Sequence, residues 1–122
     1  MFTFVIPGKP QAKGRARTKP GSGRPYTPRT TASFERYVQQ LAVLARVPKA
    51  TGPVRMEIDF KFRRARKSAG HHTARPDLSN LVKAIEDALN TIAYDDDAQI
   101  SELAVRKFYG ETDETVVKIT PL

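Results

Sequence analysis

The acidic residues of this sequence concentrate in one short stretch, residues 77–97. Six carboxylates lie there: Asp77, Glu86, Asp87, Asp95, Asp96 and Asp97. Hydrolysis of a phosphodiester near neutral pH needs an activated water and a neutralised phosphate. Mg²⁺ supplies both, through oxygen ligands and while keeping several of its waters. A nuclease site therefore needs two or three convergent carboxylates, usually with a lysine near the phosphate, and only this stretch has enough of them.

The spacing of these carboxylates limits which of them can meet. Apolar residues recur at helical intervals over residues 78–92, which predicts a helix. Asp77 precedes that helix, and Asp87 lies roughly 15 Å further along it at 1.5 Å per residue. These two side chains cannot share one ion, so a partner for Asp77 must come from elsewhere, and the turn at residues 94–97 is the candidate. Plain structural roles also exist: Asp77 can cap the helix, and Lys83 can pair with Asp87 one turn away.

Charge is distributed unevenly along the chain. The net charge is +8, but residues 1–76 carry 17 Lys and Arg against 3 Asp and Glu, whereas residues 77–122 carry 4 against 10. A basic surface beside an acidic cluster suggests a polyanion held against a carboxylate site that binds metal. The chain has no cysteine, which excludes disulfides and thiolate chemistry, and no apolar run long enough for a membrane span. A cytoplasmic protein is expected.

Periodicity and turn residues predict a single α+β domain over residues 1–122, in the order β-α-β-α-β-β. Phe2–Ile6 and the strictly alternating residues 54–62 are expected strands. A helix is expected from Thr31 to before Pro48, with Thr30 or Thr31 as its cap. The last two strands, 100–109 and 115–119, are expected to form a hairpin around Gly110 and Asp113. Two basic loops, about 7–30 and 63–76, are expected to be exposed, and His71 and His72 with them.

Two segments carry a resemblance to a known family: RPDLSNLVKAIEDALN at 75–90 and AYDDDAQI at 93–100. Together they resemble the RusA family of Holliday-junction resolvases, in which D-x-D-N-L-x-K opens a helix and a DDxQ-type turn follows. The N-terminal strand with its PGKP-type basic loop, the helix near residues 34–47, the alternating strand and the closing hairpin follow the family's layout almost end to end. The resemblance implies a mixed sheet with two helices, a homodimer, Mg²⁺ or Mn²⁺, and paired nicks across a four-way junction. It also makes a phage or prophage origin plausible.

The resemblance assigns roles to individual positions. Asp77 matches the first motif aspartate, Asn80 the asparagine and Lys83 the lysine, while Asp96 and Asp97 match the paired aspartates of the turn. In the family, the first motif aspartate and the second turn aspartate bind metal, and the lysine is needed for cleavage. Asp77 and Asp97, assisted by Asp96, are therefore the expected metal ligands, with Lys83 beside the scissile phosphate.

Ser79 departs from the family pattern, because it stands at the position of the second motif aspartate. A hydroxyl is a neutral and weaker ligand for a hard dication than a carboxylate. Either Asp96 compensates, or a water takes the place, or metal binding is poor. One alternative function is therefore a branched-DNA-binding module that has lost its metal, and another is an RNA-processing nuclease.

The basic loops are expected to grip the DNA backbone, which positions the substrate without reading its sequence. The predicted contacts are Lys13, Arg15, Arg17, Lys19 and Arg24 in the first loop and Arg63, Arg64, Arg66 and Lys67 in the second.

Overall fold

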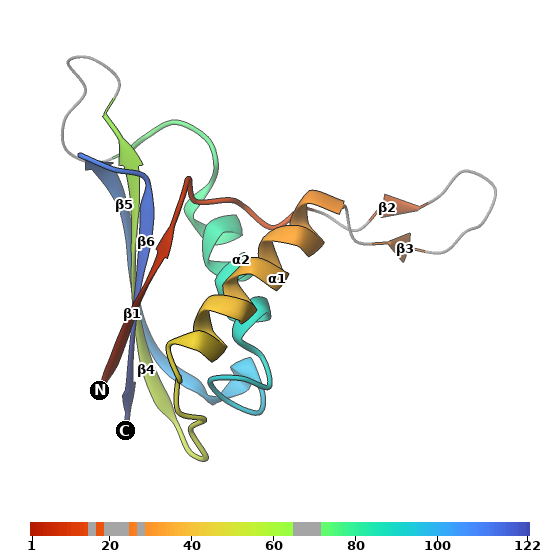
Figure 1. Ribbon diagram of the computed structural model, residues 1–122, viewed down its shortest axis with the longest axis vertical. Helices are drawn as coiled ribbons and strands as arrows, with labels where there is room; N and C mark the ends of the chain where they lie inside the picture. Colours follow the sequence, from red (N-terminus) through yellow and green to blue (C-terminus); the bar gives the residue numbers. More distant parts are fainter. Residues whose placement is uncertain (15–16, 19–24, 27–28, 65–71) are drawn as a thin grey trace.

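The computed structural model describes residues 1–14, 17–18, 25–26, 29–64 and 72–122. Two helices cover one face of a four-stranded sheet, and a short two-stranded ribbon projects from the helical side (Figure 1). The elements are β1 (Phe2–Pro7), β2 (Arg17–Thr18), β3 (Pro25–Tyr26), α1 (Arg29–Leu44), β4 (Val54–Arg63), α2 (Leu78–Leu89), the 3-10 turn η1 (Asp97–Gln99), β5 (Ile100–Gly110) and β6 (Glu114–Pro121). The predicted α+β class and the β-α-β-α-β-β order of the main body are confirmed.

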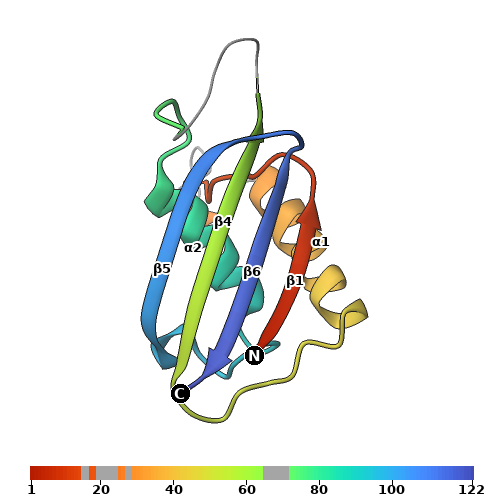
Figure 2. The same ribbon diagram turned by 90° about the vertical axis from the view of Figure 1, so that its left-hand side faces the viewer.

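β4 lies inside the sheet, whose strand order is β1-β6-β4-β5 (Figure 2). It pairs in parallel with β5 and antiparallel with β6, and it buries every second side chain from Val54 to Phe62. This burial confirms the inward face that the alternating sequence predicts, since successive side chains of a strand point to opposite faces.

The expected hairpin of the last two strands is wrong, because β5 and β6 do not pair with each other. Both pair with β4, which lies between them, and the connection at residues 111–113 crosses the end of β4. Burial explains the choice: β6 buries Thr115, Val117 and Ile119 and takes an inner position, whereas β5 has no buried residue and takes the edge. The turn residues at 110–113 indicate that the chain reverses direction there. They do not indicate whether β5 and β6 pair directly or lie on either side of a third strand.

The core forms where α1 and α2 pack on the inner face of the sheet. α2 contributes Leu81, Val82, Ala84, Ile85, Ala88 and Leu89, all buried. Phe34, Val38 and Ala42 of α1 also face the core, while Val43 and Leu44 at its end are exposed. The apolar stripe that predicted α2 is therefore the surface by which it docks, and this docking leaves its polar side available for chemistry.

The first basic segment departs from the predicted plain loop. β2 and β3 pair antiparallel as a small ribbon that extends beyond the start of α1 (Figure 1). Neither threonine caps α1, which begins earlier, at Arg29. Thr31 is instead buried, and its Oγ1 accepts a hydrogen bond of 2.9 Å from the Gly14 amide, which fixes the base of the segment to the helix.

The expectation of an exposed histidine pair is also wrong for His72, which is buried with 8% of its surface exposed. Its ring stacks on Phe62 at 4.1 Å and contacts Tyr109 at 5.0 Å between centroids. The ring is buried because it packs on two aromatic side chains of adjacent strands. The local sequence around His72 does not indicate these neighbours. His71 lies outside the described residues.

The outer face of the sheet carries charges of both signs in cross-strand pairs. Asp59 receives two hydrogen bonds from Arg106, and Lys61 pairs with Glu114 at 3.1 Å. These pairs join opposite charges of neighbouring strands. Within the described residues, no helix has the length and apolarity to cross a membrane.

Candidate active site

Lys83 and Asp97, two residues singled out from the sequence, lie together beside α2. The Lys83 ammonium is 3.8 Å from Asp97 Oδ2 and 3.4 Å from Asp87 Oδ1. The Asp87 contact is the helical i,i+4 pair that the sequence allows, and the Asp97 contact comes from the turn that follows the helix. These carboxylates raise the pKa of Lys83, chiefly through Asp87, so the side chain stays cationic.

Asp87 also pairs with a second lysine, through its other carboxylate oxygen. Lys13 Nζ lies 3.0 Å from Asp87 Oδ2 and 2.6 Å from Glu35 Oε1 on α1. Burial lowers the pKa of Lys13, but the bonds to Glu35 and Asp87 outweigh burial and raise it overall. The backbone amide of Lys13 donates to the Asn80 carbonyl at 2.9 Å. Lys13 thus holds the base of the projecting segment against both helices.

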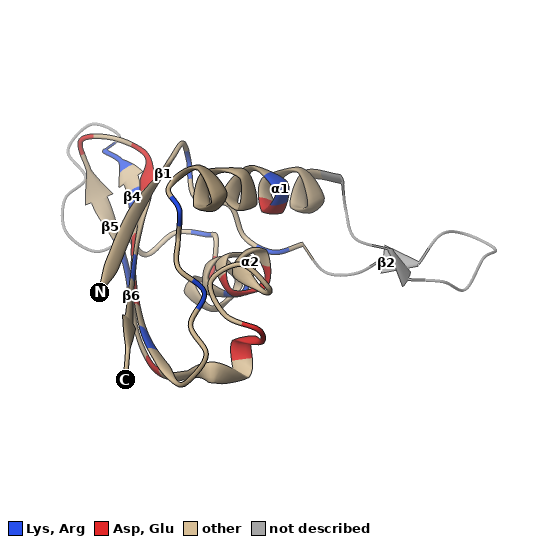
Figure 3. Ribbon diagram, turned by 60° about the horizontal axis from the view of Figure 1, so that its bottom comes forward, with Lys and Arg blue, Asp and Glu red and all other residues tan. Residues whose placement is uncertain are grey.

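Glu86 and Tyr94 show how tightly the acidic turn packs on α2. Tyr94 is fully buried, and its hydroxyl donates to the Glu86 carbonyl at 2.8 Å. Burial, with the nearby Asp97 charge, raises the pKa of Glu86. Burial also raises the pKa of Tyr94, so it remains a neutral donor. Figure 3 shows the acidic residues of α2 and of the following turn on the helical side of the molecule.

Gln99 fixes the shape of the acidic turn and was not among the predicted site residues. Its Oε1 accepts hydrogen bonds from the Asp95 and Asp96 amides at 2.7 and 3.1 Å. Its Nε2 donates to the Ala50 and Gly52 carbonyls at 3.0 and 2.9 Å. One side chain therefore ties η1 to the segment that leads into β4. The glutamine of the DDxQ-type turn was the available sequence signal, and its role here is to orient the neighbouring aspartates.

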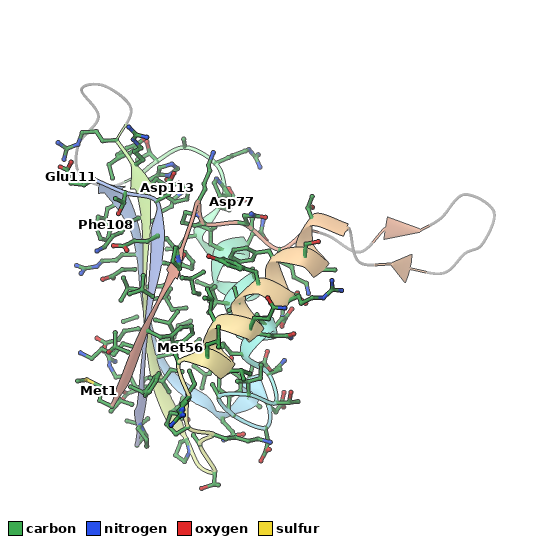
Figure 4. The ribbon with its side chains drawn as sticks, viewed as in Figure 1. Met1, Met56, Asp77, Phe108, Glu111 and Asp113 are labelled. Carbon is green, nitrogen blue, oxygen red and sulfur yellow. The ribbon has the colours of Figure 1, made fainter. Side chains whose placement is uncertain are left out.

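Asp77 does not take part in the ion pairs that Lys83 forms with Asp87 and Asp97. It lies at the start of α2, near the end of the molecule where Asp113 is found (Figure 4), whereas η1 lies toward the other end of α2 (Figure 1). It is exposed, and its side chain makes no hydrogen bond that caps the helix. Ser79 and Asn80 in the first turn are exposed as well. Asp77 therefore does not cap the helix, and its side chain is exposed.

The described residues do not present a finished metal site. No group of three or more Asp, Glu or His side chains in the described ranges is arranged to hold one ion. Asp97 lies beside the Lys83 ammonium, Asp77 precedes α2, and Ser79 brings no charge. The expected ligand set of Asp77, Asp96 and Asp97 therefore stays a prediction.

The structure describes only some of the predicted DNA contacts. Arg63 and Arg64 are exposed at the end of β4. Lys13 is engaged by two carboxylates of its own chain. Arg17 belongs to β2, with only its backbone described, and the other predicted contacts lie outside the described residues: Arg15, Lys19, Arg24, Arg66 and Lys67.

Comparison with known proteins agrees with this fold and these motifs. Residues 7–120 match the family described as Endodeoxyribonuclease RusA. The chain is also 33% identical over 132 residues to the uncharacterized protein YqaN of Bacillus subtilis (strain 168), covering 95% of this chain and 93% of that protein. The chain belongs to the RusA endodeoxyribonuclease family, and the family points to a nuclease that acts on DNA.

Proposed function

We propose that this protein is a structure-selective endodeoxyribonuclease that resolves Holliday junctions by paired nicks during DNA recombination and repair. The observation that carries the proposal is the approach of Lys83 to Asp97 across the polar side of α2, in a chain of this family. A cation held beside a carboxylate suits a phosphodiester, since it offsets charge that grows on the phosphate in the transition state. The proposed setting is the cytoplasm of a bacterial or phage-infected cell.

The proposed roles follow the motif positions. Lys83 is the residue that contacts the scissile phosphate, and Asp77 and Asp97, assisted by Asp96, are the proposed ligands of Mg²⁺, for which Mn²⁺ is a substitute. When bound, such an ion activates water and stabilises the departing oxygen. Gln99 holds the backbone of the turn, and Asp87 holds Lys83 in place.

The proposed assembly is a homodimer bound to a four-way junction. A junction has two symmetric strands to cut, and a two-fold dimer matches that symmetry with two sites. The proposed contacts to the DNA backbone are Lys13, Arg15, Arg17, Lys19, Arg24, Arg63, Arg64, Arg66 and Lys67.

A second candidate is a branched-DNA-binding module without cleavage activity. It is favoured by Ser79 in place of a carboxylate and by the lack of a ready three-ligand site in the described residues. Isothermal titration of the junction-bound protein with Mg²⁺ and with Mn²⁺ separates the candidates, because only the nuclease requires the ion.

The deciding experiment is a nicking assay on a synthetic four-way junction with and without Mg²⁺, beside duplex DNA and structured RNA of matched length. Symmetric nicks in the junction that require the metal support the proposal. Tight junction binding with no nick under any metal supports the binding module, and cutting of RNA alone contradicts both.

A further inference from the structure

A pocket of about 210 Å³ opens at one end of the sheet, where β1, β4 and β5 finish and β6 begins. Three cations line it: Lys9 after β1, Arg63 at the end of β4, and Arg75 before α2. All three side chains belong to exposed residues, and no ion pair joins any of them to a carboxylate within the described part of the chain. Asp113 is the acid in this lining, which leaves the pocket net positive.

The backbone around the pocket is held by hydrogen bonds between segments that are distant in sequence. Asp113 accepts from the Arg63 amide at 2.7 Å through its side chain and from the Gly8 amide at 3.1 Å through its carbonyl. Gly8 has a φ of 106°, a conformation that side chains oppose, and the turn there directs the chain to Lys9. Asp113 therefore holds together the backbone segments that surround the pocket.

The segment that carries Arg75 is anchored separately. Lys107 Nζ on β5 donates to the Ala74 carbonyl at 2.7 Å and to the Pro76 carbonyl at 2.8 Å. These two bonds fix the backbone on both sides of Arg75. A cation on a braced segment loses less entropy on binding an anion than one on a free loop.

Aromatic side chains form one wall of the pocket. The wall consists of Phe62, His72 and Tyr109. Burial, with the charges of Lys107 and Lys9, lowers the pKa of His72, and its buried Nδ1 has no hydrogen-bond partner among the described residues. The ring is therefore neutral at pH 7. A wall that excludes water strengthens the attraction between the cations and an anion.

We propose that this pocket binds a phosphate group of DNA, held by Lys9, Arg63 and Arg75. The two guanidinium groups suit phosphate because their planar N–H donors match its oxygens in pairs. Arg75 lies two residues before Asp77, so the bound phosphate sits beside the start of α2. The proposal rests on the proposed function only for the source of the phosphate, which is the DNA substrate.

His72 offers a local reporter for the test. Its imidazole pKa is measured by NMR in EDTA, with a short single-stranded oligonucleotide that has or lacks a 5′-phosphate. A phosphate in the pocket offsets the charges of Lys9 and Lys107, so the pKa of His72 rises on binding. A rise with both oligonucleotides identifies an internal phosphodiester, and a rise with the phosphorylated one alone identifies a strand end. No rise with either overturns the proposal.

Variants provide the second test. Arg75→Ala should abolish the rise, and so should Lys9→Ala, whereas Lys118→Ala on the outer sheet face removes the same charge and should retain it. In EDTA, the Lys9→Ala and Arg75→Ala double variant should flatten the log–log salt dependence of junction binding by about 1, because one phosphate contact is lost. A slope equal to that of Lys118→Ala contradicts the proposal. Neither readout involves cleavage. A protein that does not cut DNA would therefore contradict the proposed function without contradicting phosphate binding in the pocket.

Discussion

Lys13 and Asp87 form a 3.0 Å ion pair that ties the segment before the β2–β3 ribbon to the polar side of α2. The same carboxylate contacts Lys83, so it joins the base of the ribbon to the proposed catalytic lysine. Glu35 completes the set at 2.6 Å from Lys13, which places one ammonium between two partly buried carboxylates. Lys13 therefore has a structural role, and its contact with DNA stays a prediction.

Replacing Lys13 with Met should lower the free energy of unfolding by about 1–2 kcal/mol, because Glu35 and Asp87 lose a charged hydrogen-bond donor while they remain partly buried. The matched control is Lys49→Met, which removes a 2.6 Å pair to Asp95 that is much more exposed. That change should cost at most about 0.5 kcal/mol. Urea unfolding of both variants checks the difference, and equal losses would show that burial of the Lys13 pairs is unimportant.

Lys83→Ala should leave junction binding nearly intact while reducing cleavage at least about a hundredfold, since its charge acts where negative charge develops in the transition state. One cation among 21 Lys and Arg adds little to long-range attraction. Single-turnover cleavage at saturating protein measures the effect, with Lys118→Ala as the control for lost charge. A Lys83→Ala protein that binds poorly yet cuts normally once saturated would make Lys83 a backbone contact only.

Gln99→Ala should destabilise the protein by about 2–3 kcal/mol, because four hydrogen bonds of the side chain are lost at roughly 1 kcal/mol or less each. Gln40 on α1 is exposed, so Gln40→Ala serves as the control and should change stability little. Hydrogen exchange of the Asp95 and Asp96 amides locates the effect. Protection of those amides that matches the unsubstituted protein would contradict the proposed anchoring.

Sequence periodicity was sufficient for the body of the fold, because burial enforces it. The alternation of β4 and the apolar stripe of α2 each match one buried face, and a one-residue shift in the register of β4 would turn its apolar side chains to solvent. Strand pairing was not predictable in the same way. The sequence of β5 and β6 is compatible with a hairpin. The structure instead inserts β4 between them, because the strands compete for the inner positions of the sheet.

The contacts of the candidate site also differ in whether the local sequence predicts them. The i,i+4 contact of Lys83 with Asp87 follows from helix geometry alone, and the sequence indicates it. The contacts of Asp97 with Lys83, of Lys13 with Glu35, and of Gln99 with the segment before β4 all join segments remote in sequence. His72 is similar, since its neighbours Phe62 and Tyr109 become adjacent only when β4 pairs with β5.

His72 should make the protein acid-sensitive just below neutral pH. Its folded-state pKa is lowered, chiefly by burial, so the unfolded chain takes up a proton first as the pH falls below about 6.5. Stability is therefore full above that pH and declines as the pH falls toward the folded pKa. His72→Phe keeps a ring in the stack and should reduce the decline between about pH 7 and 5.5, measured by urea unfolding. Parallel pH profiles for the two proteins would show that the ring titrates freely.

Ser79→Asp tests the departure of this chain from its family at the proposed metal site. Ser79 is exposed in the first turn of α2, two residues after Asp77, and the first turn contains no acid. A carboxylate there adds one negative charge beside Asp77, so the Mg²⁺ concentration for half-maximal cleavage should fall several-fold, while junction affinity in EDTA stays the same. Ser79→Asn is the matched control, because it offers an oxygen without the charge. Cleavage across a Mg²⁺ series, repeated with Mn²⁺, measures the midpoints.

Because Asp in the first turn also interacts favourably with the helix dipole, by about 0.3–1 kcal/mol, thermal unfolding without metal is recorded for all three proteins. A midpoint that the substitution leaves unchanged, or a complete loss of cutting in a folded protein, would place Ser79 away from the ion and require a ligand set drawn from other carboxylates.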